Sequence, residues 1–441
     1  MTSEIIVVGG GLAGAEAAWQ AAKRGVRVLL YEMRPATMTP AHRTAHLAEL
    51  VCSNSLGSDL PDRAPGLLKQ ELRSLGSLII ACADATAVPA GGALAVDREA
   101  FAEAVTERIQ AHPLITLRRE EVTAVPERGV VVIATGPLTS APLTQAITRL
   151  AGQQHLYFYD AMAPIVTRES LDISRVFRAS RYGRGEADYI NCPLTLAEYE
   201  HFVDELLRAE TAPLRDFERE DKHFFEACLP VEEIARRGRE ALAFGPLKPM
   251  GLIDPRTGTR PHAVVQLRQD NLAATLYNLV GFQTNLKWGE QKRVFSLVPG
   301  LEHAEFVRYG QMHRNTFLNS PALLDATLEC RMRPGLFFAG QITGTEGYVG
   351  STGSGYVAGL NAARQALGLP LLVFPGSTIL GALCQYISSA EFGRFQPMKA
   401  NFGIMPGLER SRLRKRERGK AYAERSHSEL CSFIVSEGLL P

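Results

Sequence analysis

The chain has 441 residues, of which 46% are hydrophobic and 22% charged, and its formal net charge is +1. This composition is that of a globular protein, and at about 100–200 residues per domain the length predicts two or three domains. The low net charge excludes a strongly basic global field, so any nucleic-acid surface has to be a local cluster. No run of about 18 apolar residues and no signal-peptide pattern is present, so we expect a cytoplasmic protein without a membrane span.

The N-terminus predicts a strand, a glycine turn and a helix. An apolar run at residues 5–8 leads into Gly9, Gly11 and Gly14, which have G-x-G-x-x-G spacing, and residues 15–22 have a helical pattern. In this motif the first glycine allows the tight turn, the second lets the backbone approach a pyrophosphate, and the third lets the helix pack on the sheet. The free N–H groups of the helix N-terminus then face the phosphates.

A second apolar run, residues 26–31, ends at Glu32. This acid lies about 20 residues beyond the glycines, where a carboxylate accepts hydrogen bonds from an adenosine ribose. A purely structural turn is the alternative, but strand, turn, helix, strand and acid together favour a dinucleotide site. The binding residues predicted in this region are Gly9, Gly10, Gly11, Leu12, Ala13, Gly14, Glu32 and Arg34.

Two later segments predict that the dinucleotide is FAD. Residues 129–136 form a β-branched run typical of a buried parallel strand, and its Ala-Thr-Gly ending resembles flavoproteins of the glutathione-reductase type. The strand-like residues 335–341 precede a glycine-rich loop at 344–350 and a helical pattern at 353–364. In flavoproteins of this type the last strand and helix complete the FAD site. The resemblance implies as cofactor residues Ala134, Thr135, Gly136, Gly340, Gln341, Gly347, Tyr348 and Gly353.

FAD signals at both ends predict a discontinuous domain. We expect an α/β fold in which a glutathione-reductase-type, FAD-binding Rossmann-like domain carries an inserted α+β substrate domain. Residues 1–136 would be the first part of the FAD domain, 137–330 the insertion, and 331–441 the last part with a basic helical C-terminal segment. The segment 353–359 also matches a G-x-G-x-x-x-G pattern of NADP sites. No acid- or arginine-tipped strand follows it, so we expect no separate NAD(P)H-binding domain.

The seven cysteines are widely spaced, without a C-x-x-C pair, so we expect reduced thiols and no metal site. Cys52 lies in a polar, glycine-ended segment at 49–57. Cys228 precedes Pro230 and two acids that indicate the first turn of a helix, and a thiol beside a helix N-terminus ionises more readily. A cysteine is more often a core residue, and we expect that role for the other five.

These blocks together resemble the folate- and FAD-dependent tRNA uracil-5-methyltransferase (TrmFO) family, which is related to GidA-type flavoproteins of tRNA wobble modification. The resemblance runs nearly end to end, and the two cysteine blocks are its specific part. Its motifs lie at residues 32–35, 39–42, 51–56, 89–98, 134–140, 225–228, 281–284, 312–316 and 346–348.

The resemblance implies C5-methylation of the T-loop uridine in the T-arm of tRNA. Methylenetetrahydrofolate would supply the carbon, reduced FAD the reducing equivalents, and NADH or NADPH the ultimate electrons. The resemblance assigns Cys228 as the nucleophile at uracil C6 and Cys52 as a second catalytic thiol. A thiolate suits this addition, being soft and nucleophilic near neutral pH.

Several other residues are given roles by the resemblance, each with a plainer alternative. Tyr348 would stack on the flavin, or simply pack. His313 and Arg314 would contact folate or tRNA, or be structural. Arg412 and Arg416, in the basic run 410–425, would contact tRNA phosphates. Two further arginine clusters, at residues 178/181/184 and 236/237/239, would do the same. The alternative for all of these charges is a solvated helix face.

Three other functions remain open at the level of sequence. A GidA-like wobble-uridine enzyme is one, although that family carries a longer helical C-terminal region than a chain ending at Pro441. A generic NAD(P)H-flavin oxidoreductase is the second, and the lack of a second nucleotide domain argues against it. A flavin-loaded RNA-binding or redox-sensing protein is the third, and the two cysteine blocks argue against it. The oligomeric state is left open.

Overall fold

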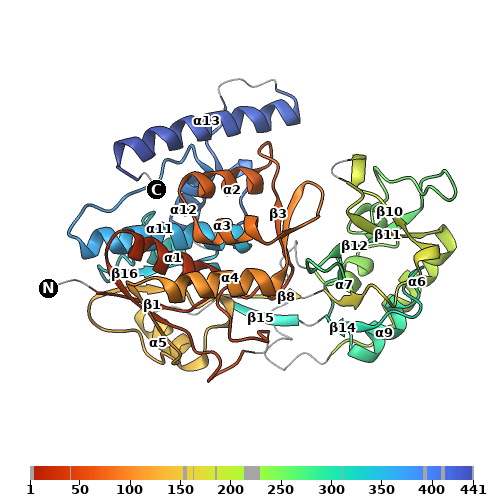
Figure 1. Cartoon of the computed structure of the whole chain (residues 1–441), viewed down its shortest axis with the longest axis horizontal. Coiled ribbons are helices and arrows are strands. Elements are labelled where there is room, and N and C mark those ends of the chain that lie inside the picture. Colours follow the sequence, from red (N-terminus) through yellow and green to blue (C-terminus); the bar gives the residue numbers. More distant parts are fainter. Residues whose placement is uncertain are drawn as a thin grey trace.

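The computed structural model describes residues 4–39, 41–151, 156–161, 163–183, 186–212, 229–310, 312–390, 395–408 and 413–439, with the backbone alone for 156–161, 312–316 and Lys415. Figure 1 shows two bodies side by side. The larger body, which we call the first body, contains both ends of the chain. The smaller, second body is built around strands from the middle of the sequence.

The first body contains a five-stranded parallel sheet. Its order is β16 (Leu336–Phe338), β7 (Val130–Ile133), β1 (Glu4–Val8), β2 (Arg27–Tyr31) and β6 (Ile115–Arg118). In register, Val8 lies opposite Tyr31 on one side and Ile133 on the other. The carboxyl ends of these strands therefore meet at one edge, where ligands bind in open α/β sheets. The strands predicted around residues 5–8, 26–31, 129–136 and 335–341 are confirmed.

Helices cover both faces of this sheet, as expected for parallel strands. α1 (Leu12–Lys23) and α11 (Tyr348–Ala366) pack on one face and α5 (Ala141–Ala151) on the other (Figure 1). A three-stranded antiparallel sheet, β3 (Ser55–Ser58), β5 (Ala93–Val96) and β4 (Ala87–Val88), lies beside them. The remaining helices are α2 (Ala64–Ser74), α3 (Leu78–Ala85), α4 (Arg98–Ala111), α10 (Ser320–Leu323), α12 (Ile379–Ser389) and α13 (Lys415–Ser436).

Helix α11 begins at Tyr348, five residues before the predicted start at Gly353, so the expected loop 344–350 ends at Gly347. The glycines within α11 are there because the helix lies very close to α1. A Cβ on Gly355 would lie 2.3 Å from the carbonyl oxygen of Ala13, and one on Gly359 would lie 2.4 Å from that of Ala17. The G-x-G-x-x-x-G spacing at 353–359 thus reflects close packing of two helices.

The second body contains a six-stranded antiparallel sheet. Its order is β10 (Phe177–Arg178), β11 (Tyr189–Leu194), β12 (Ala263–Gln269), β13 (Leu276–Leu279), β9 (Ile165–Thr167) and β14 (Phe306–Arg308). Its core is completed by α6 (Leu196–Arg208), α7 (Val231–Arg236), α8 (Ala241–Phe244) and α9 (Trp288–Phe295). The strands β8 (Leu156–Ala161) and β15 (Met312–Phe317) pair with each other.

The second sheet occupies a narrower stretch, 165–308, than the predicted insertion 137–330. Leu143 and Ile147 of α5, and Leu323 of α10, pack with strands of the first sheet. The boundaries at 136 and 330 stay a prediction. Among the described helices, none is both long and apolar enough to cross a membrane.

Candidate active site

A pocket lies at the carboxyl edge of β1, β2 and β7, where the glycine turn leaves the sheet. Residues from all three predicted FAD segments line it, although they are far apart in sequence. The predicted cofactor residues that line it are Gly9, Gly10, Gly11, Leu12, Ala13, Glu32, Arg34, Ala134, Thr135, Gly136, Gly340, Gln341 and Tyr348. The structure therefore assembles one site from the two ends of the chain.

The three motif glycines differ in what surrounds them. Gly9 has φ +105°, and a Cβ there would lie 2.6 Å from the carbonyl oxygen of Ala134. A Cβ on Gly14 would lie 1.7 Å from the Gly9 oxygen, so these two glycines are required by packing. A Cβ on Gly11 would meet nothing within 4 Å. Gly11 caps α1 without a side-chain hydrogen bond, which leaves the first N–H groups of the helix available to an anion.

Glu32, at the end of β2, is buried at the pocket wall and accepts three hydrogen bonds. Its donors are the Gly10 N–H at 2.9 Å and the Arg34 N–H and Nε at 3.0 and 2.9 Å. Burial raises the pKa of Glu32, but the bonds and charge of Arg34 outweigh it and the pKa is lowered overall. The carboxylate is therefore charged and oriented at the point where a ribose is expected.

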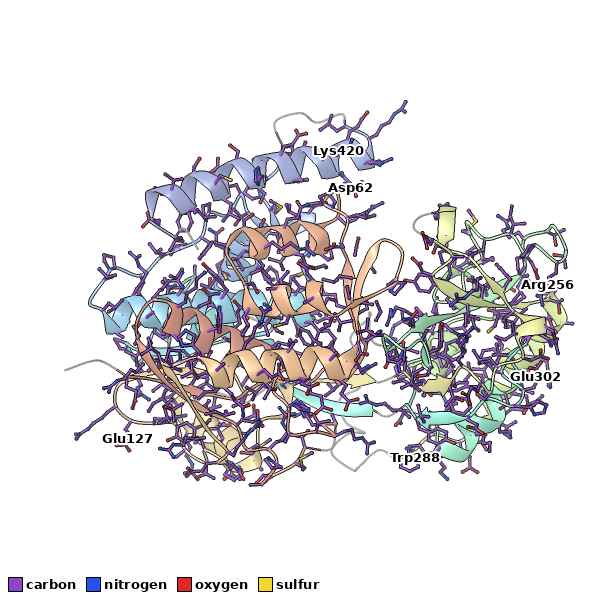
Figure 2. The ribbon with its side chains drawn as sticks, in the orientation of Figure 1. Asp62, Glu127, Arg256, Trp288, Glu302 and Lys420 are labelled. Carbon is purple, nitrogen blue, oxygen red and sulfur yellow. The ribbon has the colours of Figure 1, made fainter. Side chains whose placement is uncertain are left out.

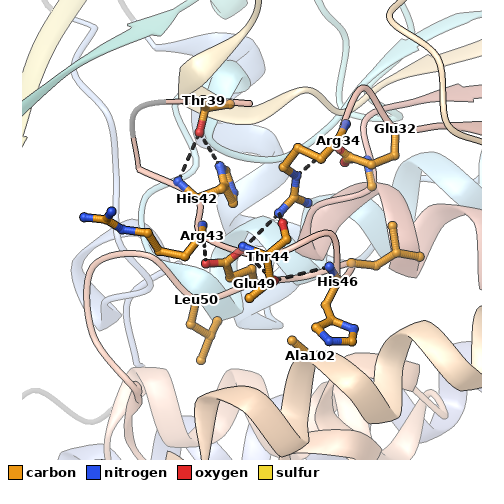
Figure 3. Close-up of polar contacts among 12 residues, drawn as sticks. Glu32, Arg34, Thr39, His42, Arg43, Thr44, His46, Glu49, Leu50 and Ala102 are labelled. Carbon is orange, nitrogen blue, oxygen red and sulfur yellow. Dashed lines mark hydrogen bonds and ion pairs between the residues drawn. The ribbon is translucent and has the colours of Figure 1, made fainter. Parts of the chain in front are cut away.

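Arg34 connects Glu32 to a second carboxylate, Glu49 (Figure 3). Glu49 accepts a hydrogen bond from an Arg34 terminal nitrogen at 3.2 Å, from the Arg43 N–H at 2.9 Å, and from the Thr44 N–H and hydroxyl at 3.0 and 2.9 Å. It thus fixes the segment that leads directly to Cys52. Sequence reasoning gave Glu49 no role, since only its contacts reveal one.

His42 is a second pocket residue that sequence reasoning left without a role, although the motif 39–42 contains it. Its Nδ1 lies 2.5 Å from the Thr39 hydroxyl (Figure 3). Burial, with the charge of Arg34, lowers the pKa of His42 to about 4. The imidazole is therefore neutral at physiological pH and presents one donor and one acceptor nitrogen.

Tyr348 lines the pocket and contacts the backbone of Cys52, which is not itself a lining residue. The phenolic oxygen of Tyr348 accepts the Cys52 N–H at 2.8 Å and the Ser53 N–H at 3.1 Å. Burial of this hydroxyl raises the pKa of Tyr348, as does the nearby Cys52. Tyr348 therefore remains a neutral phenol, and its oxygen orients the backbone that carries the thiol.

The Cys52 loop, residues 50–54, is also held from the second body. Arg268 in β12 donates to Asn54 Oδ1 at 2.9 Å and to the Ser53 hydroxyl at 2.7 Å, and Asn54 donates to the Gln269 carbonyl at 2.8 Å. Arg98, the first residue of α4, donates to the Leu50 carbonyl at 2.9 Å and pairs with Asp270 at 3.1 Å. Residues from both bodies therefore clamp this loop. Of Arg98, Arg268 and Asp270, only Arg98 lies in one of the sequence motifs, so only its role in holding the loop could have been suggested by the sequence.

The other predicted residues lie elsewhere or outside the described part. Cys228 and Arg412 fall outside the described residues, and His313 and Arg314 are on β15, described by its backbone alone. α7 begins just after Pro230, as predicted. Gly14, Gly347 and Gly353 do not line the pocket: Gly14 packs on Gly9, Gly347 has φ +84° and precedes α11, and Gly353 faces Leu380.

The basic clusters are partly engaged in local contacts. Arg416 is exposed near the start of α13 and lies 3.4 Å from Asp62, which Figure 2 shows beside the end of that helix. Arg236 pairs with Glu233, and Arg239 pairs with Asp204. Arg184 and Arg410 fall outside the described residues.

The expectation that five cysteines are structural holds for four of them. Cys82, Cys192, Cys330 and Cys384 are buried, and burial raises the pKa of Cys82 to about 11 and of Cys384 to about 12. The expectation is wrong for Cys431, which is exposed on α13 beside His427. Among the described residues, no group of three or more His, Cys, Asp or Glu side chains could hold a metal ion.

A parallel sheet with a glycine turn at its carboxyl edge and helices on both faces defines an α/β protein with a Rossmann-like dinucleotide-binding domain. A family model described as Glucose inhibited division protein A matches residues 4–370. The solved structure of Aquifex aeolicus GidA, in its form I crystal, superposes with a TM-score of 0.72 at 18% identity, over 99% of this chain and 76% of that one. The fold is therefore that of the FAD-binding, Rossmann-like GidA flavoproteins.

Relatives with higher sequence identity identify the family more specifically than the fold does. A protein of Desulforudis audaxviator, named methylenetetrahydrofolate–tRNA-(uracil-5-)-methyltransferase TrmFO, is 61% identical over 99% of this chain and 100% of its own length. Proteins of the same name from Synechococcus sp. strain JA-2-3B'a(2-13) and Enterococcus faecalis are 63% and 57% identical, over 96% and 97% of this chain and 92% and 97% of their own lengths. The chain belongs to this family, the TrmFO methyltransferases.

Proposed function

We propose that this chain methylates C5 of the T-loop uridine of tRNA, with methylenetetrahydrofolate as carbon donor and reduced FAD as reductant. The observation that carries the proposal is the identity of 57–63%, over nearly the whole chain, to relatives named for a folate-dependent tRNA uracil-5-methyltransferase. The T-loop position, the flavin and a nicotinamide electron source go beyond those names. They are supported by the site and by the resemblance of the motifs.

The pocket fits FAD by three features of its wall. The open space at Gly11 and the uncapped N-terminus of α1 suit a pyrophosphate, and the oriented carboxylate of Glu32 suits a ribose. Tyr348 and Gln341 line the same pocket and suit the flavin ring. When bound and reduced, FAD would supply the hydride that turns the transferred carbon into a methyl group. NADH or NADPH would deliver those electrons.

The thiols supply the activation that uracil needs. C5 of uracil is a poor nucleophile until a thiolate adds to C6, and we assign that addition to Cys228. The resulting enolate forms a bond from C5 to the methylene carbon. That bond forms as the C=N bond of the activated methylene opens. A base then removes the C5 proton while the C–N bond breaks and the amine leaves. Hydride addition to the methylene carbon would then expel the Cys228 thiolate and restore the ring. We assign Cys52 to this proton transfer, on a loop held by Tyr348 and Arg268.

Several further residues are proposed to contact the two substrates. His313 and Arg314 on β15 are the residues we propose for folate or tRNA. Arg412 and Arg416 are proposed to contact T-arm phosphates, since such contacts supply most nucleic-acid affinity. The target uridine has to be unstacked, because addition at C6 needs access to its face. We propose that the reaction takes place in the cytoplasm, together with its tRNA substrate.

The test is a reconstitution with the flavin-loaded protein. Unmodified tRNA transcript, methylenetetrahydrofolate and NADH or NADPH are incubated with it, and the nucleosides are analysed by mass spectrometry. We expect folate-dependent 5-methyluridine at the T-loop position, and none when that uridine is replaced by cytidine. A flavin-loaded preparation that forms no 5-methyluridine would overturn the proposal, and a modified wobble uridine would favour the GidA-like alternative.

A further inference from the structure

Arg268 is a buried arginine of the second body whose hydrogen bonds go to the Cys52 loop. It is the penultimate residue of β12 and only 7% exposed. Its Nε donates to Asn54 Oδ1 at 2.9 Å, and a terminal nitrogen donates to the Ser53 hydroxyl at 2.7 Å and to Asn278 Oδ1 at 3.4 Å. All three acceptors are neutral oxygens. Burying a guanidinium against neutral acceptors costs stability, which points to a role for its charge.

Arg268 and Cys52 are close enough to interact electrostatically. Burial lowers the pKa of Arg268, whereas negative charge on Tyr189, Asp270 and Cys52 raises it and the charge of Arg98 lowers it further. An arginine remains protonated in any of these surroundings because its ordinary pKa is above 12. A permanent positive charge therefore lies within electrostatic reach of the thiol.

The other groups around the Cys52 loop come from every element packed against it. Tyr348 of α11 faces Cys52 directly and is neutral. Arg98 of α4 is paired with Asp270, and Arg308 of β14 is influenced by both of them and by Tyr348. The pairing of Arg98 with Asp270 neutralises one of these cations. Arg268 thus remains a cation in direct hydrogen-bond contact with the residues that follow Cys52.

We propose that Arg268 is a positioning residue for Cys52: it fixes Ser53 and Asn54 and places a positive charge within electrostatic reach of the thiol. The proposal rests on the proposed function only in taking Cys52 as a catalytic thiol. Since β12 belongs to the second body, the thiol site is complete only where that body docks on the first.

The test measures the reactivity of Cys52 in the flavin-loaded protein. Iodoacetamide alkylates a thiolate by forming an S–C bond as iodide leaves, and mass spectrometry of the Cys52 peptide gives the rate between pH 6 and 9. We expect Arg268→Met to slow alkylation about fivefold at pH 7, because the positive charge near the attacking sulfur is lost, and Arg268→Lys to restore most of the rate. Arg256→Met is the matched control, since Arg256 pairs with Asp254 on the outer side of the second body (Figure 2).

A steady-state readout separates positioning from mere folding. In Arg268→Met we expect a lower kcat for tRNA methylation with little change in KM. If Arg268→Met folds, with an unchanged melting temperature, and alkylates at the wild-type rate or faster, the proposal is wrong.

Ser53→Ala keeps the test decisive if Arg268→Met fails to fold. Ser53→Ala removes one acceptor of Arg268 and leaves its bond to Asn54, and we expect slower alkylation at an unchanged melting temperature. A wild-type rate in Ser53→Ala, beside an unfolded Arg268→Met, would make Arg268 purely structural and overturn the proposal. Alkylation needs neither tRNA nor folate, so an absence of methyl transfer in the wild type would overturn only the proposed function.

Discussion

The phenolic oxygen of Tyr348 accepts the N–H of Cys52 at 2.8 Å, although 296 positions separate the two residues in sequence. Tyr348 is the first residue of α11, a helix packed closely on α1, and α1 begins at the glycine turn of the pocket. The thiol loop and the dinucleotide pocket therefore share one rigid frame. A ligand held at the turn and a thiol held by Tyr348 have a fixed relative position without any contact between Cys52 and the turn itself.

Replacing Tyr348 by phenylalanine removes the acceptor for two backbone N–H groups, those of Cys52 and Ser53. A buried donor left without a partner costs about 1–3 kcal/mol, so we expect Tyr348→Phe to lower the free energy of unfolding by about that amount, measured in urea. Tyr386→Phe is the matched control. The Tyr386 hydroxyl donates to one exposed carbonyl, that of Gln396, and its loss should cost less than about 0.5 kcal/mol. Equal effects of the two variants would contradict the role given to Tyr348.

The glycines of the turn give a second, paired prediction. In Gly11→Ala the new methyl group meets nothing in the protein and the backbone has φ −74°. Stability should therefore be unchanged or rise by about 0.4–1 kcal/mol. The methyl group would instead occupy space at the pocket wall, so flavin affinity, measured by fluorescence titration of the deflavinated protein, should fall about tenfold or more, a loss of about 1.4 kcal/mol.

Gly14→Ala should behave in the opposite way. Its methyl group would lie 1.7 Å from the Gly9 carbonyl oxygen. This steric clash can be relieved only if the backbone of the turn or the start of α1 moves. Overpacking of this kind costs about 1–3 kcal/mol or more. We expect a lower melting temperature even without flavin. A Gly14→Ala protein as stable as Gly11→Ala would contradict this assignment of the two glycines.

Local spacing explains what could be predicted from the sequence. The turn at Gly9–Gly14 and the carboxylate of Glu32 are encoded within about 25 consecutive residues, and each glycine has a steric reason that is the same in every such motif. The expected start of α11 is too late because Gly344, Gly347 and Gly350 together suggest one loop. Gly350 instead lies in the first turn of the helix and faces Leu383 of α12. Only tertiary packing distinguishes such glycines from those of a loop.

The clamp on the Cys52 loop could not be predicted for a related reason. Arg268 and Asn54 are 214 positions apart, and nothing near either residue in the sequence signals their contact. Most charged residues are solvated, so an arginine in a strand gives no sign of being buried until its partners are known. The same holds for Glu49, whose role depends on the distant approach of Arg34.

Glu71 in α2 gives a pH-dependent prediction. It accepts hydrogen bonds from the N–H groups of Ile379 and Leu380 at 2.8 Å, and from the Ser426 hydroxyl of α13 at 2.5 Å. Burial raises the pKa of Glu71 from 4.5 to about 7. Because the folded pKa is above the unfolded one, the stabilisation from this group is complete below pH 4.5 and is lost as the pH rises through 7.

The measurement compares wild type with Glu71→Gln by urea unfolding between pH 4.5 and 8. The variant cannot titrate at this position, so the difference in unfolding free energy isolates Glu71. We expect the wild-type advantage to fall by about 3 kcal/mol across this range. A difference that rises with pH would mean that the three hydrogen-bonding partners lower the pKa of Glu71 instead.

The ion pair between Arg98 and Asp270 joins the first body to the second, and its exposed fractions of 13% and 5% make it a largely buried pair. Removing one partner of such a pair leaves an uncompensated charge and costs about 3–5 kcal/mol, whereas removing both costs less than the sum. We therefore expect Arg98→Met and Asp270→Asn each to destabilise the protein strongly, and the double variant to show a favourable coupling of about 1–3 kcal/mol.

The same single and double variants also report on the Cys52 loop, because Arg98 donates a further hydrogen bond to the Leu50 carbonyl. The exposed pair of Arg208 and Glu205 is the matched control, and its coupling should be below about 1 kcal/mol. In Asp270→Asn, Arg98 keeps its bond to Leu50 but loses its charge partner, so the loop should retain its position while the docking of the two bodies weakens. Additive effects of Arg98→Met and Asp270→Asn would show that the two residues act independently and that the pair does not hold the bodies together.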